Sequence, residues 1–172
     1  MGSQALGFDP GAQTATDPQA QVKYMLAVTQ ARIHSGANWF NWIAGLSVVN
    51  AVILVFQIPV RFPVGLGMTQ AMLEIGSSRG AVGIGIGFVM TLAVAGVFVL
   101  MWHFTKQGQK WALILGIVFY TLDALLVLVV QQWLMLAFHV YALFVLFRVF
   151  SSISLYRQVK DQAAAQGIFV NP

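Results

Sequence analysis

The sequence predicts an all-α integral membrane protein, a four-transmembrane-helix bundle with an N-terminal interfacial amphipathic helix. Four apolar stretches each have about the 20 residues that an α-helix needs to cross a hydrocarbon layer about 30 Å thick. They lie at residues 38–57, 81–104, 111–130 and 133–153. The chain is 59% hydrophobic and 8% charged, whereas soluble domains are about 25% charged. At 172 residues, a soluble fold would leave too much of this apolar surface in water.

The N-terminal part divides into a polar tail and a helix. Residues 1–17 have few bulky apolar side chains, so we expect a flexible tail. The pair Asp17-Pro18 is typical of a helix start, with an N-cap followed by proline at the first helical position. Apolar side chains then recur at helical spacing through residues 18–35. This predicts an amphipathic helix in the membrane interface. A soluble helix packed on a neighbouring subunit is the alternative.

The four spans form one domain, residues 36–156. The only long loop, residues 59–80, contains a short amphipathic segment from Met68 to Ile75. Spans three and four are joined by little more than Gln131-Gln132, which requires an antiparallel hairpin. The polar tail, residues 157–172, is expected to continue the last helix before fraying.

The basic residues predict the orientation. With four spans, both termini and the 105–110 turn lie on one side. That side carries six lysine or arginine residues: Lys23, Arg32, Lys106, Lys110, Arg157 and Lys160. The opposite side carries two, Arg61 and Arg79. Because cytoplasmic loops are enriched in Lys and Arg, we expect a bacterial inner (cytoplasmic) membrane protein with both termini in the cytoplasm.

Small residues recur at every fourth position along the second span. Gly83, Gly87, Thr91 and Ala95 give it one face with almost no side-chain bulk. Such a face allows another helix to approach closely, which favours association in lipid. The partner helix could belong to the same chain or to another copy, and the sequence leaves both open.

Four polar residues are predicted to share one layer inside the membrane. At about 1.5 Å per residue, Asn50 and Thr91 lie near the midplane of their spans. Asp123 and His139 flank the tight hairpin almost symmetrically, so they lie at similar depth. Ser47 and Tyr120 lie one helical turn from Asn50 and Asp123 on the same faces.

Asp123 is the residue in this layer that most needs a partner. A carboxylate in the hydrocarbon core costs at least about 2.5–3.5 kcal/mol, so it should face the interior of the bundle. His139 is the natural candidate. The pair could be a hydrogen-bonded latch that fixes helix register, or it could exchange protons or bind an ion or a substrate.

Other chemistry has little support in the sequence. The chain contains no cysteine, which excludes disulfides, thiolate metal sites and cysteine nucleophiles. No metal-ligating histidine spacing and no catalytic motif is present, so neither a catalytic residue, a metal nor a cofactor is expected. His103 and His139 differ in depth by roughly 20 Å, too far for one haem iron within the chain.

Two aromatic residues and one arginine are expected at the membrane surface. Trp39 and Trp42 open the first span and suit the headgroup level. Arg148 lies in the cytoplasmic half of the fourth span, where it can extend its side chain to the interface. Contact with an anionic lipid is the functional alternative for Arg148.

Two functions follow as hypotheses. The first is a non-catalytic structural or accessory subunit that associates through its helices, as a homo-oligomer or within a larger membrane complex. The second is a small channel or transporter for protons or a small solute, lined by the polar layer. The lipid bilayer is a partner in both, and nucleic acid in neither.

Overall fold

The computed structural model describes residues 17–59 and 65–167, and this part of the chain folds into five helices without strands. The helices are α2 (Pro18–Val55), α3 (Gly67–Ser77), α4 (Gly80–Lys106), α5 (Lys110–Val129) and α6 (Trp133–Ala165). Four of them, α2, α4, α5 and α6, are long and apolar enough to cross a membrane. The predicted tail at residues 1–17 lies outside the described residues except for Asp17, and so does the end of the C-terminal tail, residues 168–172.

Helix α2 begins where the sequence predicted. The Asp17 side chain accepts a hydrogen bond of 2.9 Å from the Gln19 backbone N–H, with Pro18 at the start of the helix. The predicted boundary between an N-terminal helix, residues 18–35, and a first span, residues 38–57, is wrong. Residues 18–55 form one continuous helix. No proline lies between the two segments, and Gly36 is buried within the helix.

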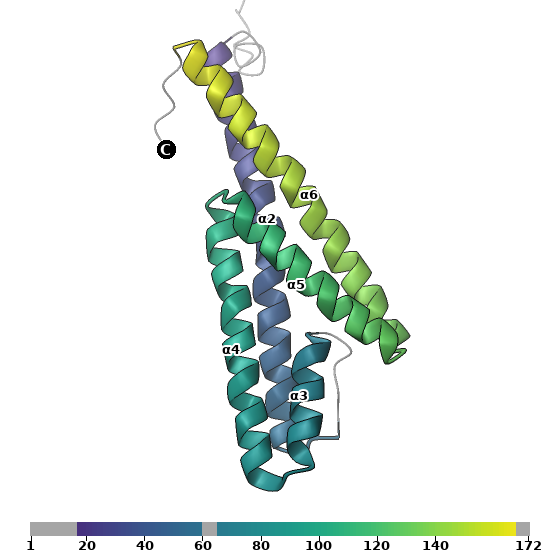
Figure 1. Cartoon of the computed structure of the whole chain (residues 1–172). Helices are drawn as coiled ribbons and strands as arrows, with labels where there is room; N and C mark the ends of the chain where they lie inside the picture. Colours follow the sequence, from purple (N-terminus) through teal and green to yellow (C-terminus); the bar gives the residue numbers. More distant parts are fainter. Residues whose placement is uncertain (1–16, 60–64, 168–172) are drawn as a thin grey trace, which may run out of the picture.

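The long helices form two groups that diverge at one end, and α3 lies between them (Figure 1). Helices α2 and α4 pack side by side, while the α5–α6 hairpin leans away from them. After α2 the chain turns back, so that α3 starts part-way along the bundle and runs outward to the start of α4. Helix α3 contacts α2, α4 and α5. The short amphipathic segment at Met68–Ile75 is therefore part of a helix that packs among three other helices.

Helices α2 and α6 continue beyond the turn that joins α4 to α5 (Figure 1). We call this extension the stalk and define it as residues 18–33 and 153–165. Its two helices bury a shared set of side chains: Leu26, Thr29, Ile33, Ile153, Val159 and Ala163. Arg157 Nη2 donates to the Gly108 carbonyl oxygen at 3.0 Å. The stalk is thus anchored to the turn between α4 and α5.

The small-residue face of α4 has its partner within the same chain. Gly83, Gly87, Thr91 and Ala95 are all buried. A Cβ added at Gly83 would overlap the carbonyl oxygen of Gly76 in α3, and one added at Gly87 would lie 3.2 Å from a backbone atom of α3. The first half of this face is therefore occupied by α3 and is closed to a second copy.

Candidate functional site at the start of helix α3

Asp123 projects from the buried face of α5 toward the first turn of α3. Its side chain is 2% exposed. Oδ2 accepts a hydrogen bond of 2.8 Å from the Gly67 N–H, and Oδ1 accepts one of 2.7 Å from the Met68 N–H. The first N–H groups of a helix have no partner inside the helix, and an anion there also interacts favourably with the helix dipole. Asp123 thus acts as a cap for a helix 55 residues away in sequence.

The sequence of α3 explains why the cap comes from elsewhere. Its N-cap residue is Leu66, which has no side-chain oxygen, and no local side chain caps the helix. The Leu66 N–H donates instead to Ser47 Oγ in α2 at 2.9 Å. The Ser47 hydroxyl in turn donates to the Ile43 carbonyl oxygen at 2.8 Å. Side chains of two neighbouring helices, α2 and α5, therefore accept the backbone N–H groups at the start of α3.

Two glycines permit this close approach. Gly65 has a φ of +123°, which side chains rarely adopt, and it lies against the Ser47 backbone. A Cβ added to Gly67 would lie only 2.5 Å from a Val127 methyl group and 3.7 Å from Asp123 Oδ1. Without a side chain at residue 67, the backbone N–H can reach the carboxylate.

His139 completes the site from α6 and is fully buried. Its Nδ1 lies 2.8 Å from the Met135 carbonyl oxygen. A carbonyl oxygen only accepts, so Nδ1 must carry a proton. His139 Nε2 lies 2.8 Å from Asp123 Oδ2. An unprotonated Nε2 and a carboxylate would both be acceptors, and this contact therefore requires one proton between the two side chains.

The Asp123 carboxyl group holds three contacts at once. Both of its oxygens accept backbone N–H groups, and Oδ2 also contacts the His139 ring. Tyr120 stacks on the His139 ring, with centroids 4.4 Å apart and an interplanar angle of 11°. Ring stacking and the Met135 bond fix the orientation of the imidazole.

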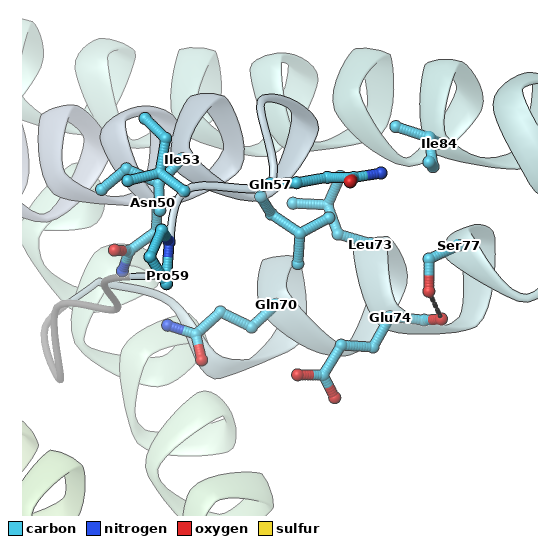
Figure 2. A pocket seen from close by; sticks show the side chains of 11 residues that line it. Asn50, Ile53, Gln57, Pro59, Gln70, Leu73, Glu74, Ser77 and Ile84 are labelled. Carbon is cyan, nitrogen blue, oxygen red and sulfur yellow. Dashed lines mark hydrogen bonds between the residues drawn. The ribbon is translucent and has the colours of Figure 1, made fainter.

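The remaining members of the predicted polar layer lie apart from this pair. The Thr91 hydroxyl donates to the Gly87 carbonyl oxygen of its own helix at 2.9 Å. Asn50 is buried and lines a separate cleft of about 650 Å³ between the ends of α2 and α3 and the start of α4 (Figure 2). The structure therefore brings together Asp123 and His139, with Ser47 at the same helix start, but not all four residues.

That separate cleft, which we call the outer cleft, has a mixed lining. Its polar side chains are Asn50, Gln57, Gln70, Glu74 and Ser77. Figure 2 shows Gln70 and Glu74 on α3, across from Asn50 of α2 and from Gln57 just beyond its end, with the Ser77 hydroxyl donating to the Glu74 carbonyl oxygen at 2.7 Å. The cleft runs along α3 from Gln70 to Ser77, toward the end of the helix, and none of its lining residues belongs to the Asp123 site.

The predicted interface residues differ in their surroundings. Trp42 is 64% exposed, as a side chain at the headgroup level would be. Trp39 is half-buried, and its ring packs edge-on against Tyr141 of α6 at 5.4 Å, so its contacts are largely within the bundle. The Arg148 guanidinium lies 5.7 Å from the Phe144 ring centre, one turn back along α6.

Comparison with protein families, curated proteins and solved structures gives no match to this chain. In residues 17–59 and 65–167, no group of three or more His, Asp or Glu side chains could hold a metal ion.

Sequence reasoning missed the backbone donors of Gly67 and Met68 as the main partners of Asp123. A signal for them exists. A glycine-flanked leucine, Gly65-Leu66-Gly67, precedes an amphipathic segment that has no capping side chain of its own. A helix start without a capping side chain needs an acceptor, and a carboxylate within an apolar helix needs donors, so each feature points to the other.

Proposed function

We propose that this protein is a non-catalytic structural or accessory subunit of a membrane assembly. In this proposal α2, α4, α5 and α6 cross the bilayer, and both termini face the cytoplasm, as the basic residues favour. Because α2 is one continuous helix of 38 residues, about 57 Å long at 1.5 Å per residue, its first part projects as the stalk rather than lying flat in the interface. The partner is a second copy of the chain or another subunit.

One observation carries this proposal: the bonds of the Asp123 carboxylate are used to build the fold. It holds two backbone N–H groups and an imidazole at 2.7–2.8 Å, and its side chain is 2% exposed. A proton or ion carrier needs its carboxylate to exchange with water or a substrate. These contacts instead support a latch that fixes α3 between the other helices.

The stalk offers a surface for a partner. Tyr24 is 71% exposed and Met25 is 45% exposed, and both lie on α2 beyond the turn between α4 and α5. In the proposed placement these apolar side chains face the cytoplasm rather than lipid. The first half of the small-residue face on α4 is occupied by α3, so association through the stalk is the better-supported route.

Native mass spectrometry of the protein, gently extracted from its own membrane, tests the proposal. We expect a defined complex with other subunits or with further copies of the chain. Replacing Tyr24 and Met25 together by Ser should dissociate that complex without lowering the yield of folded protein. A monomer that carries no partner in the native membrane extract would contradict the subunit role.

A small channel or transporter is the second candidate, and the outer cleft favours it. The cleft holds amide, carboxylate and hydroxyl groups beside an apolar wall, a combination typical of sites for small solutes. Flux measurements in liposomes distinguish the two functions. Solute or proton flux that depends on Asn50 or Gln70 would support transport, whereas absence of flux with an intact complex supports the subunit.

A further inference from the structure

We propose that a second cleft, between α2 and α6, binds the phosphate group of an anionic phospholipid. The cleft has a volume of about 530 Å³. Its polar lining consists of Arg32 and Ser35 from α2 and Arg148, Ser151 and Ser152 from α6. The inference uses the bilayer placement given above but does not depend on the subunit role.

The crossing of the two helices creates the cleft. Gly36 of α2 lies so close to Val149 of α6 that a Cβ added at Gly36 would overlap the valine methyl group. Arg32 lies one turn before Gly36, and Arg148 is next to Val149. The close contact thus places one arginine on each wall of the same cleft.

Within residues 17–59 and 65–167, neither the Arg32 nor the Arg148 guanidinium group forms an ion pair with a carboxylate. Guanidinium groups bind phosphate oxygens through paired N–H donors. Ser35 and Ser151 add hydroxyl donors to the same cleft. The cleft thus presents two guanidinium groups and the hydroxyl groups of Ser35 and Ser151, and no Asp or Glu lines it. This lining favours a phosphate that carries one or two negative charges.

The depth of the cleft favours a lipid as the source of that phosphate. Asn38, just after the cleft on α2, accepts a hydrogen bond of 2.9 Å from Trp102 Nε1 near the end of α4. The cleft is therefore level with the end of that span, where headgroups lie. Basic sites between transmembrane helices on the cytoplasmic side bind anionic lipid headgroups.

The apolar surroundings suit acyl chains. Val145 lines the cleft on the side toward the membrane centre. On the same stretch of α6, Phe144 and Phe147 are 58% and 59% exposed. A phosphate between the arginines would direct its acyl chains along this surface, and it would also pair with the Arg148 guanidinium at the level of the headgroups.

Lipid binding to the full chain in a neutral detergent tests the proposal. Native mass spectrometry with phosphatidylglycerol or phosphatidylcholine measures the affinity of each lipid. We expect phosphatidylglycerol to bind at least about tenfold more tightly, because bonds to charged groups are strong. Arg32→Gln and Arg148→Gln should each remove most of this preference. Lys160→Gln, an exposed change on the same side of the protein, should leave it unchanged.

A second arm separates a lipid from a soluble phosphate compound. Inorganic phosphate and glycerol phosphate, added at millimolar concentration, should compete poorly with phosphatidylglycerol, because they lack acyl chains. Effective competition would overturn the assignment to a lipid. The site itself would be overturned if the Arg32→Gln/Arg148→Gln double variant, with an unchanged melting temperature, still preferred phosphatidylglycerol.

Discussion

Asp123 shows how a single carboxylate can connect three helices of an apolar bundle. It lies on α5, accepts backbone N–H groups from the start of α3 and contacts His139 of α6. In lipid, water cannot satisfy the free N–H groups at a helix start. Without Asp123, α3 would begin with uncompensated donors inside the bundle. The Asp123 carboxyl group, which would be costly to bury on its own, therefore accepts from backbone donors that would also be costly to leave without a partner.

Asp123→Asn should destabilise the protein even though the side chain keeps its shape. A carboxylate accepts both backbone N–H groups, whereas an amide has only one oxygen. One of the Gly67 and Met68 N–H groups would then face an NH₂ group and lose its acceptor. We expect a loss of about 1–3 kcal/mol and a larger loss for Asp123→Ala, measured as the unfolding free energy or melting temperature in one detergent.

Asp161→Asn is the matched control, because Asp161 is an exposed acid on the stalk. It should leave the melting temperature unchanged. If Asp123→Asn melted at the wild-type temperature while Asp123→Ala did not, then a single acceptor would suffice and the double cap would have no energetic role.

At this scale the sequence allowed part of the site to be predicted. Asp123 and His139 flank a two-residue hairpin at nearly equal distances, and equal depth on antiparallel helices was enough to pair them. Their contacts with Gly67 and Met68 depend on the chain turning back after α2. No local pattern records that reversal, because the loop length is compatible with a helix on the surface and with one inside the bundle.

At the scale of helices, the packing of α3 on α4 depends on glycine at the contact. Gly76 of α3 and Gly83 of α4 lie in close contact. A Cβ added to either glycine would overlap the backbone carbonyl oxygen of the other. Gly85, two residues further on, is exposed and has no atom within 4 Å of the position of an added Cβ. Glycines on the same helix therefore have different roles, and their spacing alone does not distinguish them.

Gly83→Ala should loosen the α3–α4 hairpin, whereas Gly85→Ala should not. The obstacle at Gly83 is backbone, which cannot rotate aside, so the helices must separate at a cost of about 1–3 kcal/mol. At Gly85 the added methyl group meets no neighbour, and alanine is the better helix former by up to about 1 kcal/mol. Melting temperatures of the two variants, measured side by side, check this prediction. Equal losses would mean that the contact between α3 and α4 is not tight.

The helices themselves were largely predictable from hydropathy. The starts of α4, α5 and α6 lie within one residue of the predicted spans. The predicted break between the N-terminal helix and the first span, at residues 35–38, was wrong. A change from amphipathic to apolar sequence alters the expected surroundings of a helix, but it does not interrupt the helical backbone. The face of Gly83 and Gly87 was recognised as a packing surface, but its partner could be found only from the arrangement in space.

At the scale of the whole molecule, the two ends of the bundle differ in construction. One end carries the stalk, the turn between α4 and α5, and the contact of Arg157 with Gly108. The other end carries the α5–α6 hairpin, the start of α4 and the outer cleft (Figure 1). The excess of lysine and arginine lies at the stalk end, so the proposed orientation places the stalk in the cytoplasm and the outer cleft on the opposite side.

This orientation can be tested with single cysteines, because the chain contains none of its own. Gln132→Cys lies at the α5–α6 hairpin and Lys160→Cys on the stalk, and both positions are exposed. In intact cells that express the protein, a membrane-impermeant maleimide should label Gln132→Cys, whereas Lys160→Cys should react only after lysis. Ser78→Cys, between α3 and α4, should behave like Gln132→Cys, because the turn between α3 and α4 lies at the end of the bundle opposite the stalk (Figure 1). Labelling of Lys160→Cys in intact cells, with Gln132→Cys protected, would invert the topology and place the Arg32–Arg148 cleft in the opposite leaflet.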